Sequence, residues 1–258
     1  MKKFLLSACC MVALNLFAQI ATDEQPYGLR EGFRAQPQDR VVLLPPDMSH
    51  IEKEDLDAEQ NQGPVRYAIA VPASFTPENS GVWHQMEDGS KIWRLKVKLP
   101  GALATVTAYD RFWLPDGGKF FVYSEETRQS IGAIISEFIE GDQVKPIEFA
   151  TALIYGENVV YEYVQPSAVK EHPIISIKDI GYAYRYVENS YSKDGTRSVG
   201  SSGPCQVNIN CQEGANWQTE KRAVTRISIQ LGEDFFWCSG ALINNTANNF
   251  TPYVLTAD

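Results

Sequence analysis

Residues 235–258 read FFWCSGALINNTANNFTPYVLTAD and decide how the rest of the chain is interpreted. A small-residue turn at 238–240 leads into an apolar run, Ala241–Ile243, and a second apolar run follows at Tyr253–Leu255. A mostly polar, turn-prone segment, 244–249, lies between the two runs. Short apolar runs on either side of an Asn-rich turn predict a β-hairpin.

The hairpin resembles the first barrel of trypsin-like serine proteases, in which a Cys-Ser-Gly-Ala-Leu-Ile strand precedes a strand ending in Leu-Thr-Ala and the general-base histidine. Two segments upstream, Gly203–Cys205 and Cys211–Gly214, are similar to secreted bacterial lysyl endopeptidases, and so is the Asn-rich turn. The resemblance covers residues 200–258. It implies hydrolysis of protein or peptide substrates, after lysine in that family. The family's triad would lie beyond Asp258, so we expect no catalytic residue in this chain and interpret residues 204–258 as the truncated start of a serine protease domain.

Residues 1–18 carry the pattern of a secretory signal peptide. Two lysines follow Met1, an apolar run comes next, and Ala18 suits a signal cleavage site. The run is shorter than the roughly 20 apolar residues that a membrane-spanning helix needs. A lipoprotein signal ending at Cys9 is an alternative. The pattern predicts a secreted protein, extracellular or periplasmic, without a membrane contact once the signal is removed.

The composition excludes some classes of function. A length of 258 residues with 44% hydrophobic residues allows one or two domains and a sizeable core. The net charge is −9, so we expect no nucleic-acid partner. His50, His84 and His172 are scattered, with no second ligand at metal spacing, so we expect neither a metal site nor a cofactor.

Residues 19–64 are polar and interrupted by prolines, and we expect a lead-in segment that builds no core of its own. One short helix is predicted over 51–56. Ser49 and Glu52 have the spacing of a capping box at its start, and its first turn is acidic.

Residues 65–187 predict a series of short strands with turn signals between them. In the clearest run, 92–99, Trp93 and its alternate neighbours share one face, while Arg94 and two lysines share the other. The expected strands are 65–71, 92–99, 103–114, 119–123, 131–138, 147–154, 159–164, 174–177 and 182–187. The fold class is therefore all-β: an antiparallel β-sandwich followed by the first strands of a trypsin-like barrel.

The sandwich region also resembles, more weakly, the pro-region that precedes the protease domain in these secreted peptidases. That resemblance implies a pro-domain in contact with the protease domain. We interpret Trp83, Trp93 and Trp113 as core residues, with a sugar-stacking platform as the alternative.

Residues 188–203 are polar and rich in Gly and Ser, which predicts an exposed linker. Lys193 and Arg197 are basic sites in the linker, and in the resembling precursors maturation cuts just before the Gly-x-Cys segment. The expected cleavage region includes Gly200 and Ser201. A passive tether is the alternative.

Three cysteines remain after signal removal, an odd number for a secreted chain: Cys205, Cys211 and Cys238. The resemblance implies that each forms a disulfide with a cysteine downstream of Asp258. Two functions therefore stand: the N-terminal part of a secreted serine endopeptidase precursor, or a secreted β-sandwich binding module without catalysis.

Overall fold

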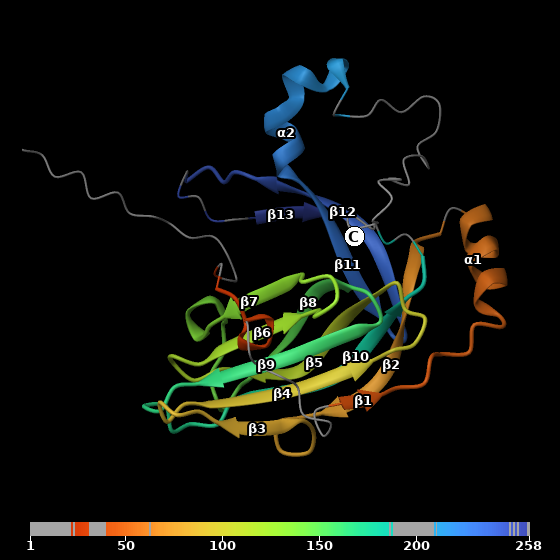
Figure 1. Ribbon diagram of the computed structural model, residues 1–258. Coiled ribbons are helices and arrows are strands. Elements are labelled where there is room, and N and C mark those ends of the chain that lie inside the picture. The colour runs from red at the N-terminus through yellow and green to blue at the C-terminus, as the bar shows by residue number, and fades with distance from the viewer. Residues whose placement is uncertain are drawn as a thin grey trace, which may run out of the picture.

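The computed structural model describes residues 22, 24–30, 40–61, 63–185, 187, 209, 211–247, 249, 251 and 253–256. Within these ranges the chain forms two β-sheets, which lie against each other in Figure 1. The all-β prediction is confirmed. The expected signal peptide, with its cleavage site at Ala18, lies outside the described residues, as do the expected linker with Lys193, Arg197, Gly200 and Ser201, and Cys205.

Sheet A has the strand order β1-β4-β9-β6-β7, and β3 also pairs with β4. Its strands are β1 (Arg40–Val42), β3 (Val82–Gln85), β4 (Lys91–Lys98), β6 (Lys119–Tyr123), β7 (Ser130–Ile134) and β9 (Asn158–Gln165). Sheet B has the order β11-β12-β2-β10-β5-β8, and β13 also pairs with β12. Its strands are β2 (Val65–Phe75), β5 (Ala104–Trp113), β8 (Ile147–Tyr155), β10 (Ile174–Ala183), β11 (Val224–Leu231), β12 (Asp234–Ile243) and β13 (Tyr253–Thr256).

The described helical segments are short. They are α1 (Ile51–Gln60), α2 (Gln218–Ala223) and the 3-10 turns η1 (Tyr27–Leu29), η3 (Ser136–Phe138) and η4 (Gln212–Trp217). Within the described part of the chain, no helix has the length and apolar character needed to cross a bilayer. The fold of the described residues is therefore built mainly from β-strands.

The main core lies between the two sheets. Trp93 and Leu95 of β4 are fully buried there, opposite Tyr163 and Tyr161 of β9. Burying one such side chain stabilises the fold by about 2 kcal/mol or more. The core interpretation is thus confirmed for Trp93, whereas Trp83 is only half-buried against the same cluster.

A buried charged network lies under η1. Glu162 of β9 is fully buried and accepts hydrogen bonds from the backbone N–H of Tyr27 (2.5 Å) and Gly28 (2.9 Å) and from Tyr123 Oη (3.0 Å). Arg94 Nε lies 3.4 Å from a Glu162 oxygen. Burial raises the pKa of Glu162, although the two N–H donors and Arg94 act in the opposite direction. Arg94 is itself buried, because the lead-in segment covers its side of sheet A.

Four local expectations need correction. The run 174–177 and the first two residues of the run 182–187 belong to one strand, β10, which ends at Ala183. A bulge between Ile177 and Asp179 breaks its alternation of apolar residues. The small residues 238–240 lie inside β12 rather than in a turn. Gly240 fits there because an added Cβ would come within 2.8 Å of the Ile227 side chain on β11.

The remaining corrections concern two short strands, β1 and β3, and the residue that precedes α1. The sequence analysis assigned no strand to either region, and β1 pairs with β4 in parallel, so sheet A is not wholly antiparallel. The expected helix is confirmed, but His50 rather than Ser49 precedes it, without a capping side-chain hydrogen bond. The expected hairpin is also confirmed, since Leu242 pairs with Val254 across the Asn-rich turn.

We expect Glu162→Gln to destabilise the sandwich by about 3 kcal/mol, because it leaves Arg94 without its most buried anionic partner. Chemical denaturation monitored by tryptophan fluorescence measures the change. Glu157→Gln is the matched control. It removes an exposed ion pair with Lys98 and should have a clearly smaller effect. Equal effects of the two substitutions would contradict the structural role of the buried network.

Candidate functional site

The C-terminal segment is hydrogen-bonded to the sandwich along the edge of β2. Residues 234–237 of β12 pair antiparallel with residues 65–69 of β2, with a bulge between Phe235 and Phe236. In Figure 1, β11 and β12 run from the sandwich to the end of the molecule that carries α2 and β13. We call this contact the junction, and its side chains are Arg66, Tyr67, Ser228, Asp234, Phe235 and Trp237.

Aromatic side chains form the apolar part of the junction. The rings of Tyr67 and Trp237 are stacked with their centroids 3.9 Å apart, and the Arg226 guanidinium lies 4.1 Å from the centroid of the Trp237 ring. Phe235 is 2% exposed, and it fits because Gly181 of β10 has no side chain: a Cβ there would lie 3.0 Å from the Phe235 ring. The stacked pair contributes about 1 kcal/mol beyond its buried area.

A hydrogen bond and a raised pKa mark the buried end of Tyr67. Its hydroxyl shares a hydrogen bond with Ser228 Oγ of β11. Burial raises the pKa of Tyr67 to about 12, although the hydrogen bond to Ser228 acts in the opposite direction. The phenol therefore stays neutral at physiological pH and serves as a hydrogen-bonding contact between the sandwich and β11.

Arg66 forms the charged part of the junction. Its guanidinium contacts Asp234 of β12 (3.1 Å), Asp55 of α1 (2.9 Å) and Glu54 of α1 (3.0 Å). Burial alone would lower the pKa of Arg66, but its hydrogen bonds to the three carboxylates outweigh burial and raise it. Arg185 adds a second cation against Asp55 (3.1 Å). One side chain thus connects the lead-in helix, the sandwich and the C-terminal segment.

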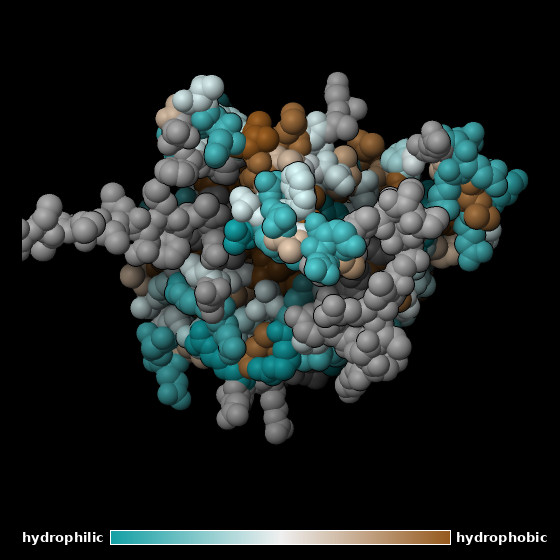
Figure 2. All heavy atoms as spheres, turned by 90° about the horizontal axis from the view of Figure 1, so that it is seen from above, coloured by the Kyte–Doolittle hydropathy of each residue, from teal (hydrophilic) through white to brown (hydrophobic). Residues whose placement is uncertain are grey.

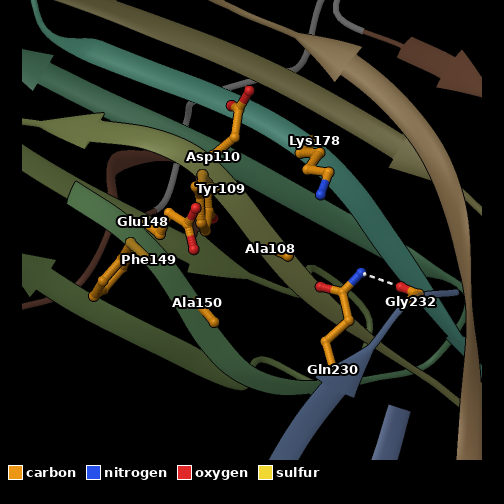
Figure 3. Close-up of a pocket in the computed structure, with 9 residues that line it drawn as sticks. All are labelled: Ala108, Tyr109, Asp110, Glu148, Phe149, Ala150, Lys178, Gln230 and Gly232. Carbon is orange, nitrogen blue, oxygen red and sulfur yellow. Dashed lines mark hydrogen bonds between the residues drawn. The ribbon is translucent and has the colours of Figure 1, made fainter. Parts of the chain in front are cut away.

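A trough separates β11 from the outer face of β5 and β8. Two adjoining cavities of about 460 and 470 Å³ form it, and both are lined by Ala108, Ala150 and Gln230. Figure 3 shows Gln230 reaching from β11 toward the sandwich strands, with its amide donating to Gly232 O. Small side chains on its sandwich side keep this trough open.

Gln129 closes part of the edge of β8 beside the trough. Its Nε2 donates to Leu153 O (2.8 Å), and its Oε1 accepts from Tyr155 N (2.8 Å). The side-chain amide thereby binds the two backbone groups that a neighbouring strand would bind.

The cysteines predicted to form disulfides are described at two positions. Cys211 is exposed at the start of η4, and Cys238 is half-buried in β12, with its Sγ 3.4 Å from Thr256 Oγ1. Both are free thiols, and the described ranges contain no disulfide. Their pairing with cysteines further along stays a prediction.

The described residues bring together a contact surface rather than a set of reacting groups. They hold no group of three or more His, Cys, Asp and Glu residues arranged for a metal ion. The three histidines lie on elements other than the protease-like hairpin of β12 and β13. His50 precedes α1, His84 lies in β3, and His172 lies in the loop before β10. Strand pairing, aromatic stacking and ion pairing are what the junction can supply.

Sequence reasoning did not find the junction residues. Arg66 and Asp234 are separated by 168 positions, and no local pattern links them. The one available signal is composition, because Phe235, Phe236 and Trp237 form an aromatic run that needs apolar neighbours.

Residues 199–258 match the family model described as lysyl endopeptidase, C-terminal domain. The match covers less than a quarter of the chain and includes η4, α2, β11, β12 and β13. No solved structure matches the chain. The part that matches the family is therefore the part that the sandwich binds at the junction.

We expect Trp237→Ala to loosen the junction while leaving the sandwich folded, because the change removes the stack on Tyr67. Hydrogen exchange in β11 and β12 should accelerate about tenfold, which corresponds to a loss of about 1.4 kcal/mol. Exchange in β4 and β9 should not change. Trp217→Ala, at an exposed tryptophan of η4, is the control. Equal protection of β12 in both variants would show that the stack does not hold the junction.

Proposed function

We propose that the sandwich is the pro-domain of a secreted serine endopeptidase precursor of the lysyl endopeptidase type, and that the junction is its contact with the protease segment. The observation that carries the proposal is the pairing of β12 with β2. The strand β12 lies in residues 199–258, which match the family, and β2 belongs to the sandwich that precedes them. The chemistry proposed for the precursor is hydrolysis of peptide bonds in protein substrates, after lysine.

The exposed surface of the C-terminal strands supports this interpretation. Leu242, Ile243, Tyr253, Val254 and Leu255 are each between 43 and 62% exposed. In the view from above, apolar side chains reach the surface at this end of the molecule (Figure 2). Strands with apolar side chains on both faces are typical of the interior of a larger β-structure, such as the barrel of a trypsin-like protease.

The contacts at the junction also suggest how the two parts separate. The stack, the ion pairs and the backbone hydrogen bonds are non-covalent, so a cut in residues 188–203 would leave the sandwich bound to the protease segment. In this proposal Lys193 or Arg197 is the site of the maturation cut, and Gly200 and Ser201 lie in the segment it frees. The sandwich is released only when the junction opens.

A secreted binding module without catalysis is the second candidate function. The observation that favours it is a groove beside Trp83, on the strands of sheet A rather than at the junction.

We expect residues 1–258 alone to hydrolyse no lysyl ester or peptide, because the sequence contains no Gly-Asp-Ser-Gly-Gly nucleophile segment. A chromogenic lysyl ester and active-site titration with a fluorophosphonate measure the activity. Steady turnover of the ester that stops when the fluorophosphonate phosphonylates a serine would contradict this expectation.

We expect the isolated sandwich to slow a mature lysyl endopeptidase in trans, because the edge of β2 is then free to pair with the counterpart of β12. The apparent inhibition constant should rise about tenfold in a sandwich carrying Tyr67→Ala, which removes the stacking partner. Lys98→Gln, on β4 of sheet A and away from the junction, serves as the control. Full activity at saturating sandwich would make the region an accessory module instead of an inhibitor.

A further inference from the structure

A second hollow lies on sheet A and the loop after β9. Two adjoining cavities, of about 250 and 140 Å³, are both lined by Lys91, Gln165 and His172. Their lining comes from β3, β4, the end of β9 and the loop that follows β9. We call these two cavities together the groove. None of its lining residues belongs to the junction.

One wall of the groove is aromatic. Trp83 lines the larger cavity, and its indole Nε1 donates to Pro77 O (3.2 Å). Its ring lies edge-on to that of Tyr163, with the centroids 6.1 Å apart and the planes at 85°. These two contacts fix the orientation of the indole without covering it, since Trp83 stays half-buried. A fixed, partly exposed indole offers a flat apolar surface to a ligand ring.

Two lysines and two histidines line the groove. Lys91, His84 and His172 line the larger cavity, and Lys170 lines the smaller one. None of the described residues that line it is acidic, in a chain whose net charge is −9. The nearest carboxylates in sequence belong to Asp88, which accepts from the Ser90 backbone N–H, and to Glu171, which accepts from the backbone N–H of Lys170. The groove thus favours an anionic group.

Gln165 supplies the third feature. It is 5% exposed and lines both cavities, and its Nε2 donates to Val169 O (2.9 Å). Its Oε1 is buried and has no hydrogen-bond partner among the described residues. A buried acceptor without a donor costs about 1–3 kcal/mol, so a ligand that brings a hydroxyl donor gains by binding there.

We propose that the groove binds a hexuronic acid unit of an acidic saccharide. The carboxylate of such a sugar would pair with Lys91 and His172, one ring hydroxyl would donate to Gln165 Oε1, and the apolar face of the pyranose ring would lie on Trp83. Each of the three features matches a different part of this one ligand. A neutral sugar leaves the cations without a partner, and a simple carboxylate leaves Trp83 and Gln165 unused.

This site adds a binding function to the sandwich that is independent of proteolysis. It would hold the protein on surfaces rich in uronic acids while the junction remains occupied. Its test needs no active protease, so failure of the proposed function leaves the result interpretable.

The test is a titration of the full chain with trigalacturonate, in which calorimetry and tryptophan fluorescence measure binding. Maltotriose provides the ring without the charge, and tricarballylate provides three carboxylates without the ring. Trigalacturonate should bind at least about tenfold more tightly than either. Lys91→Gln and Trp83→Phe should each weaken binding about tenfold.

The matched controls lie outside the groove. Lys98→Gln changes another lysine of β4, and Trp113→Phe changes a half-buried tryptophan of β5; neither should alter affinity. Thermal unfolding of each variant shows whether it folds, and Lys91, which is exposed, remains informative where Trp83→Phe does not fold. The proposal is overturned if trigalacturonate does not bind, if tricarballylate binds equally well, or if Lys91→Gln binds like the unmodified chain.

Discussion

The backbone hydrogen bonds between β2 and β12 are the constraint on which the C-terminal part of this molecule depends. The strands β11, β12 and β13 bury little apolar surface by themselves, since many of their apolar side chains are exposed. Here β11 and β12 become part of sheet B, and Phe235 is buried among Tyr67, Val106 and Ala183 of the sandwich. The family-matched strands are therefore held in place by strands of sheet B that lie outside the match.

Two charged networks tie the lead-in segment to this sheet system, and each centres on a buried side chain. Glu162 holds the backbone of η1 against sheet A, and Arg66 joins α1 to β2 and β12. Buried charges specify geometry more than they add stability, since their desolvation offsets much of their attraction. The polar lead-in can therefore occupy a defined position on the sandwich without building a core of its own.

The sequence predicted the elements that have a regular pattern. Alternating apolar residues identify β4, and the Asn-rich turn identifies the hairpin of β12 and β13, because both signals are local. The bulge at Lys178 hid the continuity of β10, since one extra residue reverses which face each later side chain occupies.

The candidate site was beyond sequence reasoning because its parts are far apart in the chain. Tyr67 and Trp237 come into contact only because β2 and β12 pair in one sheet. No local sequence pattern in either segment predicts this contact. The burial of Arg94 shows the same limit, because alternation cannot tell which side of a sheet a distant segment will cover. Trp83 and Gln165 likewise share a groove only through the pairing of β3 and β9 with β4.

The amide of Gln129 makes the two margins of sheet B unequal. At β8 a side chain already satisfies Leu153 O and Tyr155 N, whereas at β11 the described chain places no further strand. The addition of another strand is therefore hindered at β8, where these two backbone groups are already bound. One glutamine therefore makes the β8 margin of sheet B a poorer partner for a further strand.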